Sequence, residues 1–160
     1  MNKTYLLLGS NLGNSRQQLQ KATRHITKKI GPLLHQPALY ATAAWGNTQQ
    51  PDFLNQVIVI STALEVKETL QAILAIEKAM GRIRTVKNAP RIIDIDILFF
   101  NRAIITEKLL VVPHPQIQHR RFVLIPLNEI APRLIHPVLK KNIHQLLAAC
   151  TDPLDVKKFY

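Results

Sequence analysis

The sequence is poor in cysteine and in acidic side chains. It has one cysteine, Cys150, among 160 residues, so neither an intrachain disulfide nor a cysteine-based metal cluster is possible, and Cys150 is interpreted as a small apolar residue on a late helix. Ten aspartates and glutamates stand against 21 lysines and arginines, a formal net charge of +11. This excess favours anionic ligands. Nucleic acid, an acidic membrane surface and a polyphosphate substrate all satisfy it, and charge alone does not separate them.

Long apolar runs are also missing. The first run, residues 5–8, ends at Gly9 and Ser10 and is too short for a signal peptide, and no stretch reaches the length that crosses a bilayer. A cytoplasmic protein without a membrane partner is the simplest expectation. With 47% hydrophobic and 19% charged residues, the chain suits one compact domain over residues 1–160.

Hydrophobic periodicity predicts alternating strands and helices. The expected strands are 4–8, 34–44 with an edge position or a break at Pro37, 53–63 and 92–100. The expected helices are one that begins at Asn14 or Ser15 and stops at Gly31, then 66–80, 116–130 with an interruption at Pro126, and 142–149. This order is typical of an α+β, ferredoxin-like βαββαβ core with additional C-terminal helices. Because that fold carries many unrelated functions, it does not decide the function.

Two carboxylates occupy alternate positions of one predicted strand. The side chains of Asp94 and Asp96 project from the same face, while Ile93, Ile95 and Ile97 face the core. Like charges side by side repel unless a cation lies between them, and carboxylate oxygens suit a hard divalent cation. The alternative is a solvent-facing edge of an amphipathic strand, since short motifs often match by chance.

Cationic side chains flank this pair in the sequence: Arg82, Arg84, Lys87 and Arg91 upstream, and Arg120 and Arg121 downstream. Arginine binds phosphate oxygens through parallel N–H groups. Carboxylates that hold magnesium beside arginines that hold phosphates are typical of phosphoryl transfer. His114, between two prolines, is a further candidate for phosphate contact or proton transfer. The turn at residues 9–13 lacks a Walker ending and is interpreted as a tight turn.

Two other classes of function stay open at this point. A basic nucleic-acid-binding module would need exposed aromatic residues on its central strands, and the strand 92–100 instead places aspartates side by side. A different phosphotransferase with the same metal pair is the second alternative.

Taken in order, several segments resemble the hydroxymethyldihydropterin pyrophosphokinase family over nearly the whole chain. The matching stretches are Leu8-Gly9-Ser10-Asn11-Leu12-Gly13, Tyr40-Ala41-Thr42, Gln50-Pro51-Asp52-Phe53-Leu54-Asn55, Glu77 with Gly81-Arg82-Ile83-Arg84, Pro90-Arg91-Ile92-Ile93-Asp94-Ile95-Asp96-Ile97-Leu98, Val112-Pro113-His114-Pro115, Arg120-Arg121-Phe122-Val123-Leu124 and Pro126-Leu127-Asn128-Glu129-Ile130-Ala131-Pro132. The ordered set is specific, above all Pro-Arg-x-x-Asp-x-Asp followed by Pro-His-Pro.

The resemblance implies transfer of diphosphate from ATP to the hydroxymethyl group of 6-hydroxymethyl-7,8-dihydropterin, with release of AMP, in folate biosynthesis. It implies that Asp94 and Asp96 bind two Mg²⁺ ions and that both residues are catalytic. The other implied roles are catalysis and phosphate binding for Arg82 and Arg91, phosphate binding for His114 and Arg120, nucleotide contacts for Glu77, Arg84 and Ile97, and pterin contacts for Gly9, Thr42, Trp45, Phe53, Asn55 and Phe122. The expected partners are ATP and the pterin, without nucleic acid, and the expected state is a monomer.

The chain departs from the family pattern in two loops. The family commonly has Arg-Trp-Gly before its Pro-Arg, where this chain has Lys87-Asn88-Ala89. After Thr42 the family often has prolines and a leucine, where this chain has Ala43, Ala44 and Trp45. Lys87 is the candidate substitute for the missing arginine, and Trp45 is a candidate aromatic wall.

Overall fold

One antiparallel sheet organises the chain, which the computed structural model describes over residues 1–43, 51–82 and 90–159. Its strand order is β5-β1-β4-β3-β8, and β2 also pairs with β4. The strands are β1 (Asn2–Ser10), β2 (Leu33–His35), β3 (Leu39–Thr42), β4 (Phe53–Thr62), β5 (Asp94–Phe100) and β8 (Val156–Phe159). The order β5-β1-β4-β3, with one helix after β1 and one after β4, confirms the predicted ferredoxin-like core.

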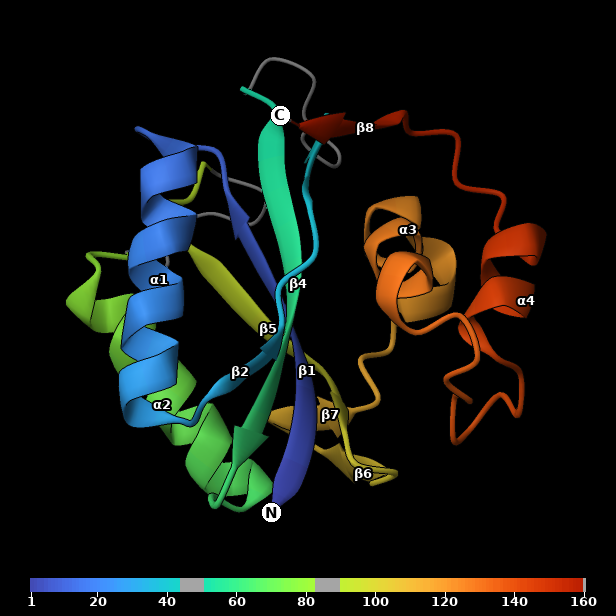
Figure 1. The fold of residues 1–160 in the computed structure, drawn as a ribbon, viewed down its shortest axis with the longest axis horizontal. Coiled ribbons are helices and arrows are strands. Elements are labelled where there is room, and N and C mark those ends of the chain that lie inside the picture. The colour runs from blue at the N-terminus through green and yellow to red at the C-terminus, as the bar shows by residue number, and fades with distance from the viewer. Residues whose placement is uncertain (44–50, 83–89, 160) are drawn as a thin grey trace.

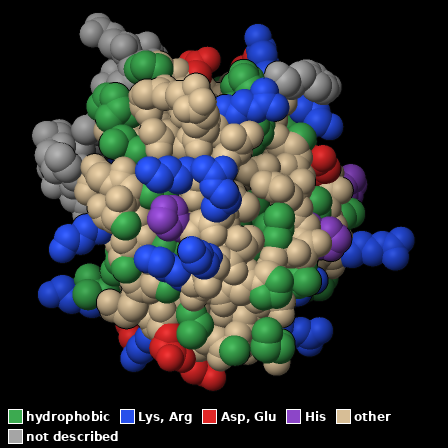
Figure 2. Space-filling view, turned by 60° about the vertical axis from the view of Figure 1, so that its left-hand side comes forward, with side chains coloured by type: hydrophobic (Ala, Val, Ile, Leu, Met, Phe, Trp, Pro, Cys, Tyr) green, Lys and Arg blue, Asp and Glu red, His purple; other side chains and the backbone are tan. Residues whose placement is uncertain are grey.

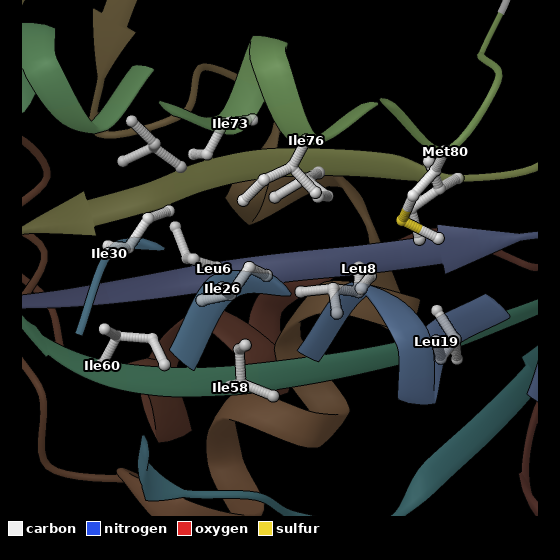
Figure 3. Close-up of a cluster of buried hydrophobic side chains, with 14 of the residues drawn as sticks. Leu6, Leu8, Leu19, Ile26, Ile30, Ile58, Ile60, Ile73, Ile76 and Met80 are labelled. Carbon is white, nitrogen blue, oxygen red and sulfur yellow. The ribbon is translucent and has the colours of Figure 1, made fainter. Parts of the chain in front are cut away.

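Helices cover both faces of this sheet (Figure 1). Helices α1 (Ser15–Lys29) and α2 (Val66–Ala79) pack on one face, and α3 (Arg121–Ile130) and α4 (Ile143–Ala149) cover the other. Side chains alternate along a strand, so Leu6 and Leu8 of β1 enter the first core while Leu7 enters the second. Figure 3 shows the first core, where side chains of α1 and α2 meet those of β1 and β4. Burial on both faces explains why these strands are continuous apolar runs.

The predicted limits of α1 are confirmed. The Asn14 side chain caps the helix by accepting a hydrogen bond from the Gln17 N–H at 3.2 Å. Its stripe of Leu19, Ala22 and Ile26 is buried. Gly31 follows the helix at a close approach to β4, because a Cβ atom there would lie 1.8 Å from the Ser61 carbonyl oxygen.

The region after β5 differs from prediction. In place of one helix over 116–130 interrupted at Pro126, the structure has a 3-10 turn, η1 (Ile117–His119), and then α3, so the division falls at Arg120. Pro126 lies inside α3, where it removes only one backbone hydrogen bond and is itself buried. The hairpin of β6 (Ile105–Glu107) and β7 (Leu110–Val112) was not predicted, and neither was β8. Residues 34–44 do break near Pro37, into β2 and β3.

Positive side chains are spread over the face that α1 and α2 cover (Figure 2). Helix α1 alone has five exposed lysines and arginines and no acidic residue: Arg16, Lys21, Arg24, Lys28 and Lys29. Part of the net charge therefore lies on the surface of this helix. Within the described residues, none of the helices combines the length and the apolar character needed to cross a membrane.

Candidate active site

Two cavities border β5: Asp94 and Asp96 line the first, and Ile95, Asp96 and Ile97 line the second. The first has a volume of about 220 Å³ and is lined by Leu7, Gly9, Thr42, Ala43, Phe53, Asn55, Arg91, Asp94, Asp96, Arg120 and Phe122. The second has a volume of about 740 Å³ and lies between α2 and the β6–β7 hairpin, with walls that include Lys67, Leu70, Gln71, Leu74, Glu77, Asp96, Ile97, Glu107, Lys108, Leu110, Val111 and His114. Asp96 belongs to both walls, so the two cavities border the same residue.

The carboxylate pair lies as its spacing predicted. Ile93, Ile95 and Ile97 are buried, while Asp94 and Asp96 face the first cavity. Burial, followed by the negative charges of Asp94 and Glu77, raises the pKa of Asp96 to about 7. Because these negative charges repel one another, the binding of a cation beside Asp94 and Asp96 is favourable.

Arginines hold the Asp94 carboxylate from two sides. Arg82 donates from Nη1 to Oδ1 at 2.7 Å, and Arg91 donates from Nη1 to Oδ2 at 2.8 Å. Arg91 also lines the first cavity. Arg82 lines neither of the two cavities, and its Nη1 is shared between Asp94 and Glu77. The predicted contact of Arg82 with phosphate stays a prediction, because in the structure its visible partners are carboxylates.

Glu77 connects helix α2 to the carboxylate strand. Its side chain is buried, and Oε2 accepts hydrogen bonds from the Ile95 N–H at 2.9 Å and from Arg82. Burial raises the pKa of Glu77, although these two hydrogen bonds act in the opposite direction. Glu77 is therefore an anchor for β5 as well as part of the second cavity.

His114 and Arg120 reach the site from the segment that follows β7. Burial, followed by the positive charge of Arg120, lowers the pKa of His114 to about 4, so the ring is neutral at physiological pH. Its Nδ1 accepts a hydrogen bond from the Gln116 N–H at 3.1 Å, which leaves the proton on Nε2. Arg120 lines the first cavity, with its guanidinium 5.6 Å from the centre of the Phe122 ring.

The first cavity combines aromatic walls with polar groups. Phe53 and Phe122 line it, and Gly9 leaves room for a neighbour, since a Cβ there would lie 3.0 Å from Asn55 Oδ1. Asn55 is buried, and among the described residues its Nδ2 has no hydrogen-bond partner. The Thr42 hydroxyl donates to the Asp155 carbonyl at 3.2 Å. A flat ligand with a hydrogen-bonding edge fits such a lining.

Some predicted site residues fall outside the described ranges, and some lining residues were not predicted. Trp45, Arg84 and Lys87 lie outside the described residues. The walls that sequence reasoning missed are Leu7 and Ala43 in the first cavity, and Lys67, Leu70, Gln71, Leu74 and the hairpin residues in the second. The apolar run before Pro113 was the available signal for a hairpin. Over the described part of the chain, no cluster of three or more His, Cys, Asp or Glu side chains is placed to hold a metal ion.

Comparison with known proteins decides between the open alternatives. The family model for 7,8-dihydro-6-hydroxymethylpterin-pyrophosphokinase matches residues 5–132. The chain belongs to this family. A 2-amino-4-hydroxy-6-hydroxymethyldihydropteridine pyrophosphokinase from Methylorubrum extorquens is 41% identical over 99% of both chains, and one from Aquifex aeolicus is 39% identical over 91% of this chain and 90% of its own.

Longer proteins also contain a segment similar to this chain. The folic acid synthesis protein fol1 of Pneumocystis carinii is 38% identical over 92% of this chain, which spans 20% of that protein. A crystal structure of Plasmodium falciparum HPPK-DHPS with pteroate covers 92% of this chain and 42% of its own, with a TM-score of 0.75 and 19% identity. The latter supports the fold alone. The predicted family is confirmed, and the chain is a diphosphotransferase of folate biosynthesis that acts on a pterin.

Proposed function

We propose that ATP occupies the second cavity, that 6-hydroxymethyl-7,8-dihydropterin occupies the first, and that diphosphate passes between them beside Asp96. The observation that carries this proposal is that Asp96 lines both cavities. A donor and an acceptor bound in these two spaces would both lie beside Asp96, which is the proximity that group transfer requires.

The shapes of the cavities support this assignment of substrates. The second is the larger, and Leu70, Leu74 and Leu110 offer apolar contact to a nucleotide base. The neutral His114 has an N–H at Nε2 available for a phosphate oxygen. The first cavity suits the pterin, because Phe53 and Phe122 can cover its ring and Nδ2 of Asn55, which has no partner within the described ranges, can donate to its edge.

The residues present fit magnesium. Asp94 and Asp96 supply carboxylate oxygens on one strand face, and the raised pKa of Asp96 arises partly from neighbouring negative charges that a divalent cation would offset. We propose that these two residues hold two Mg²⁺ ions together with the ATP phosphates. Bound magnesium would neutralise phosphate charge and favour ionisation of the attacking hydroxyl.

In the reaction, the hydroxymethyl oxygen forms a bond to the β-phosphorus of ATP, and the bond from that phosphorus to the oxygen shared with the α-phosphate breaks. AMP leaves with that oxygen, and the hydroxyl proton passes to water. Arg91 and Arg120 line the first cavity together with Asp96, so they are placed to stabilise charge on the diphosphate as it passes toward the pterin. Arg82 acts behind them by holding Asp94 and Glu77.

The test is to incubate the protein with ATP, Mg²⁺ and the pterin, and to measure AMP. Asp94→Ala and Asp96→Ala should each lower turnover by at least about a hundredfold, since loss of a metal ligand costs several kcal/mol of barrier. Asp155→Ala is the matched control, because its exposed side chain pairs with Lys157 and lines neither of the two cavities, while its contact with Thr42 is made by the backbone carbonyl, which the substitution keeps. Folded Asp94 or Asp96 variants with near-full activity would contradict the metal assignment. The cytoplasmic location, the monomeric state and the absence of a nucleic-acid partner stay predictions. Analytical ultracentrifugation measures the oligomeric state.

A further inference from the structure

Asn11 is a buried polar residue that the catalytic scheme above does not use. It directly follows β1 and is 2% exposed. Its backbone N–H donates to the Arg91 carbonyl at 3.1 Å, and its side-chain Oδ1 accepts from the Arg91 N–H at 2.8 Å. Its Nδ2 donates to the Pro51 carbonyl at 3.2 Å. One side-chain amide therefore holds two segments that are 40 residues apart in the sequence.

Both segments lead into the first cavity. Arg91 stands three residues before Asp94 and binds its carboxylate. Pro51 stands two residues before Phe53, at the start of β4, and Asn55 follows on the same strand. From these contacts we infer that Asn11 is a positioning residue, which aligns the Arg91–Asp94 pair with the pterin-binding wall. This inference rests on the proposed use of the first cavity.

The chemistry of the amide explains why asparagine suits this position. The side chain must accept a hydrogen bond from Arg91 and donate one to Pro51 at the same time. Aspartate has the same shape and retains the acceptor but has no donor, and alanine has neither. Comparing asparagine, aspartate and alanine at this position therefore separates the effect of the Arg91 hydrogen bond from that of the Pro51 hydrogen bond.

The same strand provides a matched control. Asn2, at the opposite end of β1, also links the strand to a distant segment, because its Nδ2 donates to the Leu64 carbonyl at 2.8 Å. Its partners lead away from both cavities. Asn2→Ala thus removes two side-chain hydrogen bonds, this one and the one that Asn2 Oδ1 accepts from Asn101 Nδ2 at 2.9 Å, without touching the site.

The experiment compares Tm, kcat and both KM values of Asn11→Ala, Asn11→Asp and Asn2→Ala. Asn11→Ala should lower kcat and raise the KM for pterin, each by about tenfold, the effect of about one lost hydrogen bond. Asn11→Asp should recover kcat through the Arg91 contact, while its KM for pterin stays raised. Asn2→Ala should lower Tm by about as much as Asn11→Ala does, while its kcat and both KM values stay at the wild-type level.

Any of three outcomes would overturn the inference. The first is that activity follows Tm alone in all three variants, and the second is that Asn11→Asp has the kinetics of Asn11→Ala. If Asn11→Ala does not fold, the comparison of Asn11→Asp with the wild type still decides, because a wild-type KM for pterin in that variant also refutes the inference. A wild-type enzyme that releases no AMP counts against the proposed function instead.

Discussion

Asn55 buries an amide donor, Nδ2, that has no hydrogen-bond partner among the described residues. Leaving such a group unpaired costs about 1–3 kcal/mol, and a ligand that accepts from it recovers that free energy. Asn55→Ala should therefore weaken pterin binding by about ten- to a hundredfold and leave the affinity for an ATP analogue unchanged. Calorimetry with each ligand measures both. Equal losses of affinity for the two ligands would show that Asn55 supports the fold and does not bind the pterin specifically.

His114 makes a prediction about pH. Its pKa in the folded protein is about 4, below the ordinary value of 6.5. Between those values the unfolded chain binds more protons, so this residue makes the free energy of unfolding rise with pH from about 4 to about 6.5. His114→Gln should remove about 1–2 kcal/mol of that rise, measured by urea unfolding at pH 4.5 and 7. Parallel pH curves for the two proteins would refute the prediction.

At the scale of elements, α2 contributes to both the core and the second cavity. Its inner residues Ile73 and Ile76 pack on the sheet, Glu77 anchors β5, and its outer residues face the β6–β7 hairpin. The hairpin is joined to the helix across the cavity by an ion pair between Lys67 Nζ and Glu107 Oε2 at 3.3 Å. The width of the second cavity therefore depends on two elements that are distant in the sequence.

This pair predicts a specific effect on ATP binding. Both side chains are largely exposed, so the pair contributes less than about 1 kcal/mol to stability. Lys67→Glu or Glu107→Lys should raise the KM for ATP about two- to fivefold at low salt, and the exchanged double variant should restore it. The KM for pterin is the internal control. If the double variant does not restore the KM for ATP, the two residues act independently.

At the scale of the whole molecule, the protein has a net charge of +11, opposite in sign to the polyanion ATP. Exposed charges attract ATP over distances that salt screens within about 8–10 Å. Raising ionic strength from about 50 to 500 mM should lower kcat/KM for ATP by about tenfold and leave the KM for the uncharged pterin unchanged. Lys21→Glu combined with Lys28→Glu, both on α1 and outside the cavities, should weaken this salt dependence. A kcat/KM that does not depend on salt would show that the surface charge has no part in ATP capture.

Local patterns in the sequence determined the elements that local physics controls. The alternation of Asp94 and Asp96 with isoleucines predicted their common face, because side chains alternate in any strand. The stripe of α1 and its cap at Asn14 were likewise readable, since helix periodicity and capping involve residues a few positions apart. The family resemblance identified the activity in the same way, from short ordered motifs.

Only the tertiary structure decided how distant segments meet. The contact of Arg82 with phosphate stays a prediction, while the structure shows what its position in the sequence did not: its guanidinium donates to Glu77 and Asp94. The second core beneath α3 and α4 and the cavity closed by the hairpin depend on contacts across the whole chain. Asn11 occurs in a motif that the sequence could show only as a turn, while its bonds to Pro51 and Arg91 exist only after folding. Sequence periodicity determines which way a side chain points, and the packing of the folded chain determines which distant group it meets.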